Sequence, residues 1–384
     1  MRAQGVGGAF WPNTVQHELL RIALGPVDEA AARWRQLQPV DMSALPPGSF
    51  GLLPLLYERL TELAPDEPQL PLLVGTYRNT WYRNKLLADR LARLLPLLRE
   101  HGVEALVVGG AALQRWYPAP GSRSSSPLEL IVPPPALPAV RAACVAAGWR
   151  PAGAWRSYVR FVDEGAPLVV HAGVPAQLAG ALGAAEAYGL LRSEAVEGPS
   201  AGGAPLFLGV ADQLLLLCAM APGPGRQGSC QWLIDVHHVL TSEARPPAEA
   251  LLARARRLAA VEPLRSTLLY LARNLGSPGL EKYADAAASI RGGRRERVAF
   301  FLAGAPVGRL AAVTQLLGAH VRRSSDQPLF RVVGGLPGYL QDRWGTASLA
   351  ETLKVGARKT ARVLAASRQR ARSARNPSAS SQGS

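Results

Sequence analysis

One carboxylate stands in the short stretch "SSSPLELIV" at residues 124–132. Because side chains alternate along a strand, Leu128 and Leu130 would point into a core and Glu129 would point to the opposite face. There Glu129 could bind Mg²⁺ or act as a catalytic base, or it could be a solvated carboxylate on an open strand. A single carboxylate is a poor Mg²⁺ site, because such sites combine one or two carboxylates with substrate phosphates.

Five further residues could bind a phosphate group. "VVGGAAL" places Gly109 and Gly110 where a strand turns into a helix, and glycine lets a backbone approach an anion closely. The loop "GSRSSS" offers the Arg123 guanidinium and the Ser124 hydroxyl, and His171 ends the run "LVVH". Each has a plainer interpretation: a turn that requires glycine, an exposed loop, and a histidine that hydrogen-bonds within the fold.

The elements that must position these residues form a mixed unit of helices and strands. "EALVV" and "LELIV" predict two strands, and "ALPAVRAACVAAGW" predicts a helix that ends at Gly148. "WRSYVRFVDEGAPLVVHAG" predicts a hairpin that turns at residues 163–165. The order of elements predicts a nucleus of α+β structure over residues 101–208, which is an ordinary domain size.

Helical patterns lie on both sides of this unit. Residues 1–100 contain several, and the longest passes through "TYRNTWYRNKLLADRLARLLPLLREHG", where Gly102 should end it. Residues 209–350 are helical again, and residues 351–384 form a basic tail whose polar end predicts disorder. The predicted fold class is α+β, with a mixed sheet between N-terminal and C-terminal helical regions.

The charge of the chain is uneven. The 384 residues carry a formal net charge of +15. Between Lys354 and Arg375 the chain has eight basic residues and no acidic one, so the tail holds about half of the excess. This predicts contact with a polyanion, either nucleic acid or an anionic membrane surface, through the tail.

Cysteine usage and hydropathy predict a cytoplasmic protein. The three cysteines form no CxxC pair, which favours reduced thiols over a disulfide scaffold. The N-terminus shows no signal-peptide pattern. No transmembrane segment is predicted, because the most apolar late stretch, residues 298–321, contains Pro306 and Arg309.

Several blocks in a fixed order resemble the uncharacterised nucleotidyltransferase family of the polymerase-β-like superfamily. They are "FGLLPLLYERL", "TYRNTWYRNKLLADRL", "HGVEALVVGGAALQRWYPAPGSR", "LELIV", "AAGW" and "LVVHAGV", and the likeness spans residues 15–350. The resemblance implies a nucleotidyltransferase-type sheet and metal-dependent nucleotide transfer. It also implies a place in polysaccharide assembly.

The resemblance further implies a strand of the form Asp-x-Asp and a third Asp two residues before a His. Asp-x-Asp puts two carboxylates on one strand face, roughly 7 Å apart. With a third from a neighbouring strand they can hold two Mg²⁺ ions, which activate the attacking hydroxyl and neutralise phosphate charge.

On this pattern the three carboxylate positions fall on Pro127, Glu129 and Val169, with His171 retained. Gly109 stands where the family usually has a lysine. Pro127 has no side-chain oxygen, and its missing N–H is tolerated at the start of a strand. Glu129 is therefore the remaining candidate for both metal ligand and catalytic residue.

A later segment, "LIDVHHVL", could suggest a second metal site. Asp235 and His238 are three residues apart and could share a helix face, but no second cluster completes a site. We interpret the segment as an amphipathic core helix, and its Asp235 resembles an Asp of the family.

Three functions remain open. The first is a nucleotide- or phosphate-binding or regulatory module with a degraded metal site and no cofactor. The second is an active transferase that uses Mg²⁺ and a displaced carboxylate, Glu104, Asp163 or Glu164, beside Glu129. The third is an inert core with a basic tail that binds nucleic acid or a membrane surface.

Overall fold

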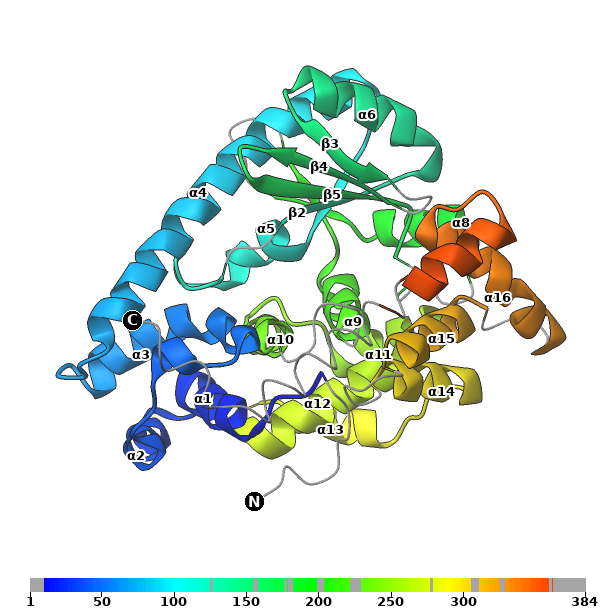
Figure 1. The fold of residues 1–384 in the computed structure, drawn as a ribbon. Helices are drawn as coiled ribbons and strands as arrows, with labels where there is room; N and C mark the ends of the chain where they lie inside the picture. Colours follow the sequence, from blue (N-terminus) through cyan, green and yellow to red (C-terminus); the bar gives the residue numbers. More distant parts are fainter. Residues whose placement is uncertain are drawn as a thin grey trace.

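The computed structural model describes residues 10–124, 127–154, 158–175, 182–198, 204–221, 229–276, 279–304, 311–324 and 329–358, together with residues 178 and 361. These residues form a mixed sheet at one end of the molecule and a large helical region at the other (Figure 1). The predicted α+β class is confirmed.

The N-terminal region is helical, and the long helix that leads into the sheet is its main element. Its helices are α1 (Thr14–Leu24), α2 (Val27–Leu37), η1 (Met42–Ala44), η2 (Pro47–Leu52), α3 (Leu53–Leu63) and α4 (Leu70–Glu100). Asn13 begins α1 with a capping box in which its side chain accepts from the Gln16 backbone N–H. α4 stops before Gly102, whose φ of 69° is left-handed, so the predicted stop is confirmed.

The sheet has seven strands in the order β3-β4-β5-β2-β1-β7-β6. The elements of this region are β1 (Leu106–Val108), α5 (Gly109–Leu113), η3 (Gln114–Trp116), β2 (Leu128–Val132), η4 (Pro134–Ala136), α6 (Leu137–Ala146), β3 (Arg150–Ala154), β4 (Tyr158–Asp163), β5 (Ala166–Ala172), α8 (Ala184–Arg192), β6 (Val196–Glu197) and β7 (Leu206–Phe207). β4 and β5 form the predicted hairpin, and Glu164 and Gly165 turn it with φ values of 42° and 81°.

Two hydrophobic cores lie on opposite faces of the sheet. On one face, leucines of α4 and small apolar residues of α6 pack against the inward residues of β2, β4 and β5. On the other face, Leu106, Val108 and Ile131 join a larger core that contains residues from both the N-terminal and the C-terminal helices. The two helical regions therefore share one core.

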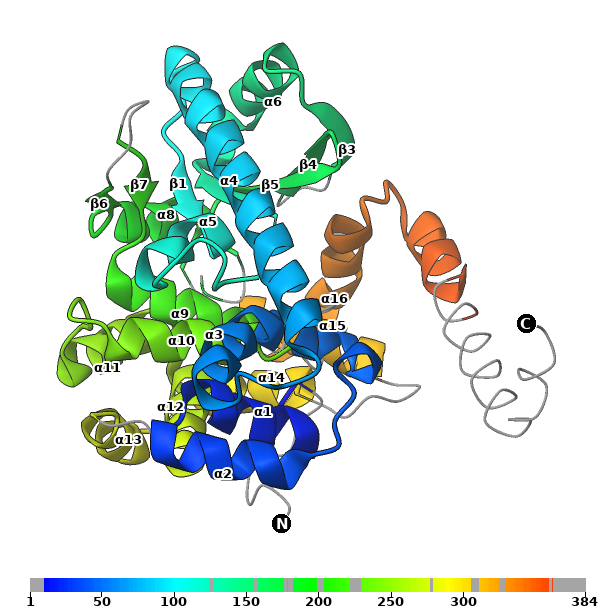
Figure 2. The same ribbon diagram turned by 90° about the vertical axis from the view of Figure 1, so that its left-hand side faces the viewer.

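The C-terminal region consists of eight described helices. They are α9 (Val210–Met220), α10 (Gln231–Thr241), α11 (Ala248–Arg257), α12 (Val261–Leu275), α13 (Glu281–Ala288), α14 (Arg294–Ala303), α15 (Ala311–Arg323) and α16 (Leu329–Trp344). A further helical stretch at 349–358 stands away from the body (Figure 2). The predicted disorder of the tail end falls outside the described residues.

Within the described part of the chain, no helix combines the length and apolar character that a bilayer span requires.

We expect the three cysteines to react with a thiol reagent only after unfolding. Cys144, Cys218 and Cys230 are free and buried, and burial raises the pKa of each thiol to about 12. The thiolate is the reactive form, so native protein should react very slowly with Ellman's reagent. All three thiols should titrate in guanidinium chloride. Fast reaction under native conditions would contradict the burial.

Candidate functional site

Strand register places Glu129 beside Val169. β2 and β5 pair in parallel, with Glu129 opposite Val169 and Ile131 opposite His171. Leu128 and Leu130 point to the α4 and α6 side and are buried. Glu129 and Val169 therefore share the other face, and the expected arrangement of these two positions is confirmed.

Glu129 lies against the end of β1. Its carboxylate Oε2 is 3.8 Å from Nε2 of His171, and the side chains of the two residues are 16% and 15% exposed. Gly109 has a φ of +64°, and a Cβ there would lie 3.1 Å from the Glu129 carboxyl. A lysine at this position would need a Cβ in that space, in a backbone conformation that favours glycine.

The structure also shows the surroundings of the residues that were predicted to bind a phosphate. Gly109 has a carboxylate beside it, and Gly110 is buried in α5. Ser124 is half-buried, and its carbonyl accepts a hydrogen bond from Arg123. Pro127 comes directly before β2, two residues ahead of Glu129, and carries no oxygen toward the shared face.

The Arg123 guanidinium is buried against a carboxylate and is not open to an anion, contrary to what the sequence of its loop suggests. It is 4% exposed, and its Nε and Nη2 donate to both carboxylate oxygens of Asp235 on α10, at 2.8 and 2.9 Å. The Tyr117 hydroxyl donates to Asp235 Oδ1 at 2.6 Å, and Gln231 donates to the same oxygen at 3.1 Å. Because the pair is bidentate and buried, the guanidinium of Arg123 stabilises the fold and is not available to bind a ligand.

The charges in this cluster support one another. Burial disfavours the cation of Arg123, but the Asp235 carboxylate more than offsets it, and the pKa of Arg123 is raised. Burial, followed by the charge of Asp235, raises the pKa of Tyr117 well above its usual value. Tyr117 is thus a neutral hydroxyl that donates to the carboxylate.

The loop that carries Arg123 is also held from α3 and α4. Asn84 donates to the carbonyls of Pro120 and Arg123 at 2.7 and 2.8 Å, and Ser122 donates to Glu58 at 2.6 Å. The loop approach to β2 is therefore fixed by hydrogen bonds to its backbone and side chains.

The three carboxylates considered as displaced ligands are paired with arginines. Glu104 forms an ion pair with Arg192 before β1. At the hairpin turn, Asp163 and Glu164 accept from Arg90 of α4, each at 2.9 Å. Within the described residues, no group of three or more His, Cys, Asp or Glu side chains could hold a metal ion.

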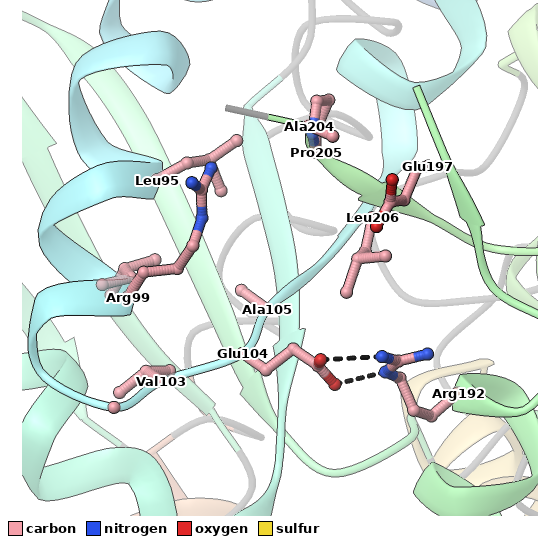
Figure 3. A pocket seen from close by; sticks show the side chains of 12 residues that line it. Leu95, Arg99, Val103, Glu104, Ala105, Arg192, Glu197, Ala204, Pro205 and Leu206 are labelled. Atoms are coloured by element: carbon pink, nitrogen blue, oxygen red, sulfur yellow. Dashed lines mark hydrogen bonds and ion pairs between the residues drawn. The ribbon is translucent and has the colours of Figure 1, made fainter. Parts of the chain in front are cut away.

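Two cavities border the sheet, and neither is lined by Glu129, Val169 or His171. One of about 400 Å³ lies between the end of α4 and the strands β1 and β7, with Arg99, Glu197 and the Glu104–Arg192 pair on its wall (Figure 3). The other, of about 220 Å³, lies between α4 and α5, and Gly110 and Leu128 line it.

Asp235 is a position to which the sequence alone assigns no role, and the structure shows it to be the buried partner of Arg123. Its signal was a lone Asp in an apolar helix, and its partner Arg123 is 112 residues away in the chain. The His238 ring, three residues further along α10, is tilted against the Tyr117 ring with the two centroids 4.3 Å apart, and the His237 ring centroid is 5.8 Å from that of His238.

Comparison with known proteins gives one match. The sequence model of the uncharacterised nucleotidyltransferase family matches residues 49–276. This span is shorter than residues 15–350, because α1, α2 and the helices after residue 276 fall outside it. Searches of curated proteins and of solved structures gave no match.

We expect Asp235→Asn to lower the free energy of unfolding by about 3–5 kcal/mol, because it leaves the buried Arg123 cation without its counter-charge. Urea unfolding followed by circular dichroism measures this. The matched control is Glu104→Gln in the Glu104–Arg192 pair, whose side chains are 46% and 41% exposed. It should cost less than about 1 kcal/mol. Equal costs would contradict the importance of burial.

We expect His237 to make the fold less stable in mild acid. Burial, followed by the charge of His238, lowers the pKa of His237 from 6.5 to about 4. As the pH falls, the unfolded chain therefore binds a proton at His237 before the folded chain does. The contribution of neutral His237 to the free energy of unfolding is complete above pH 6.5 and is lost as the pH falls toward 4.

The loss from His237 should reach about 3 kcal/mol at the acid end. Urea unfolding at a series of pH values should show a shallower decline for His237→Gln than for the unmodified protein. Parallel curves would show that His237 does not titrate in this way.

Proposed function

Because the chain belongs to the uncharacterised nucleotidyltransferase family, we propose that its sheet binds a nucleotide or another phosphorylated ligand without transferring a nucleotidyl group. The observation that carries this proposal is the register of β2 and β5. Val169 occupies the rung beside Glu129, so an apolar side chain stands where a carboxylate would be needed.

The residues on this face do not fit a pair of Mg²⁺ ions. Pro127 and Val169 offer no side-chain oxygen, which leaves Glu129 as the one carboxylate of the three positions. Two divalent ions about 4 Å apart need fixed negative charge from several ligands. The His171 ring lies 3.8 Å from the Glu129 carboxylate and supplies no negative charge for a second metal ion.

The residues of the family pattern that this chain retains near Glu129 are suited to binding. Gly110 and Ser124 lie where β1 ends and before β2 begins, and His171 is opposite Ile131, two residues beyond Glu129. None of the three requires a metal to contact a phosphate. Arg123 supports the loop through Asp235 instead of contacting ligand. Nucleotide sugars belong among the candidate ligands, because the resemblance implies polysaccharide assembly. A regulatory role follows if binding changes a partner's access to this face.

The alternative of an active transferase has weaker support. It requires Glu104, Asp163 or Glu164 to come beside Glu129. Glu104 lies four residues before Val108, which pairs with Glu129, a span of roughly 13 Å along an extended chain. Asp163 and Glu164 lie at the hairpin turn and are bound to Arg90.

We expect the double substitution Pro127→Asp with Val169→Asp to create metal affinity that the unmodified chain lacks. It would place three carboxylates on one face around Glu129. Calorimetric titration with Mg²⁺ and Mn²⁺ measures the gain, and Pro127→Asn with Val169→Asn is the control of similar shape without charge.

The unmodified protein should transfer no label from nucleoside triphosphates above background with either metal. Metal-dependent transfer by the unmodified protein, abolished by Glu129→Ala, would show that the active-transferase alternative is correct.

A further inference from the structure

A cationic side chain lies on the same rung of the sheet as Glu129 and Val169. β4 pairs with β5 so that Arg160 is opposite Val169 and Tyr158 is opposite His171. Val159 and Phe161 are each 2% exposed and belong to the core with α4 and α6. Because side chains alternate, Arg160 and Tyr158 point to the opposite face, which is the face of Glu129.

On β4, this face is open to solvent at Arg160, which is exposed. The core against α4 and α6 occupies the other side of these strands, and Figure 2 shows α4 and α6 together on one side of β3 and β4. Arg160 is exposed, while Val169 and His171 are half-buried. The rung therefore runs from a half-buried carboxylate, past a valine, to an exposed guanidinium.

The charge of Arg160 is available to a ligand, unlike that of three other arginines near the sheet. Arg90, Arg123 and Arg192 are each bound to a carboxylate. Among the residues that the structure describes, none forms a hydrogen bond or ion pair with the Arg160 side chain. A guanidinium presents its N–H groups as a fork that matches two phosphate oxygens.

A neutral Val169 and a cationic Arg160 beside Glu129 change which ligands this face of the sheet can bind. A cluster of carboxylates repels a phosphate unless divalent cations lie between them. Here the neutral Val169 sits between Glu129 and Arg160, and neighbouring strands are about 4.8 Å apart, so the two charged residues are roughly 10 Å apart at their backbones. A phosphate can approach Arg160 directly, and the Glu129 carboxylate can accept hydrogen bonds from hydroxyl groups of the same ligand.

We propose that Arg160, with Tyr158 and His171 on the next rung, binds the phosphate of a phosphorylated sugar without a divalent metal. Glu129 accepts hydrogen bonds from hydroxyl groups of the sugar. The inference rests on the proposed function, because it assigns the residues and the ligand chemistry of the same face. It goes further in replacing the family's metal ions with a protein cation.

The test is calorimetric titration of the full chain with ATP, UTP, UDP-glucose and glucose 1-phosphate, each in EDTA and again in Mg²⁺. We expect at least one to bind in EDTA, and Arg160→Gln to weaken that binding about 10- to 100-fold, the usual range for hydrogen bonds to a charged group. Arg160→Lys keeps the positive charge but lacks the forked N–H donors, so its affinity should lie between those of the unmodified protein and of Arg160→Gln. Arg141→Gln, an exposed arginine on α6 behind the sheet, should bind as the unmodified protein does.

The outcomes separate the two proposals. Binding in EDTA that Arg160→Gln leaves unchanged would overturn the role of Arg160 and leave the proposed function standing. Binding that requires Mg²⁺ would overturn the metal-free mode. No binding of any of the four compounds by the unmodified protein would overturn both proposals. Circular dichroism and thermal unfolding of each variant confirm that the exposed substitution leaves the fold intact.

Discussion

The buried ion pair between Arg123 and Asp235 connects the two halves of the molecule. Arg123 lies in the loop that enters β2, and Asp235 lies on α10 in the core of the helical region. Both charges are withdrawn from water, so each is tolerated because the other is present. Through this pair, the start of the strand that carries Glu129 is fixed relative to the helices. The position of the candidate site therefore depends on it.

The strands of the sheet could be predicted because the sequence features that specify them are local. Alternation of apolar and polar residues in "LELIV" and "LVVH" specifies which side chains face the core, and a strand with one buried face has a strongly specified register. The turn at Glu164 and Gly165 and the stop at Gly102 follow from left-handed backbone conformations. Placing Glu129 and Val169 on one face needed only these local rules and the resemblance.

The partners within the site were not predictable in the same way. Arg123 in a serine-rich loop has the local features of an open anion site, and only the fold brings Asp235 to it across 112 residues. Arg160 was missed for a related reason. Its importance depends on β4 lying next to β5 in register with Val169, a pairing that the sequence of β4 alone does not assign to a site.

The two faces of β2 and β5 differ in how much the fold depends on them. Leu128, Leu130, Leu168 and Val170 are at most 1% exposed and fill the core against α4 and α6. On the other face Ile131 belongs to the larger core, but Glu129 and Val169 are half-buried and belong to neither core, so substitution at these two positions should cost less folding energy. On the alignment that the resemblance implies, Pro127 and Val169 stand where the family has aspartates, and they remove the repulsion between like charges in a cluster. In the proposed function the fold keeps this surface and changes its chemistry, because the Arg160 guanidinium beside Val169 offers positive charge to a phosphate.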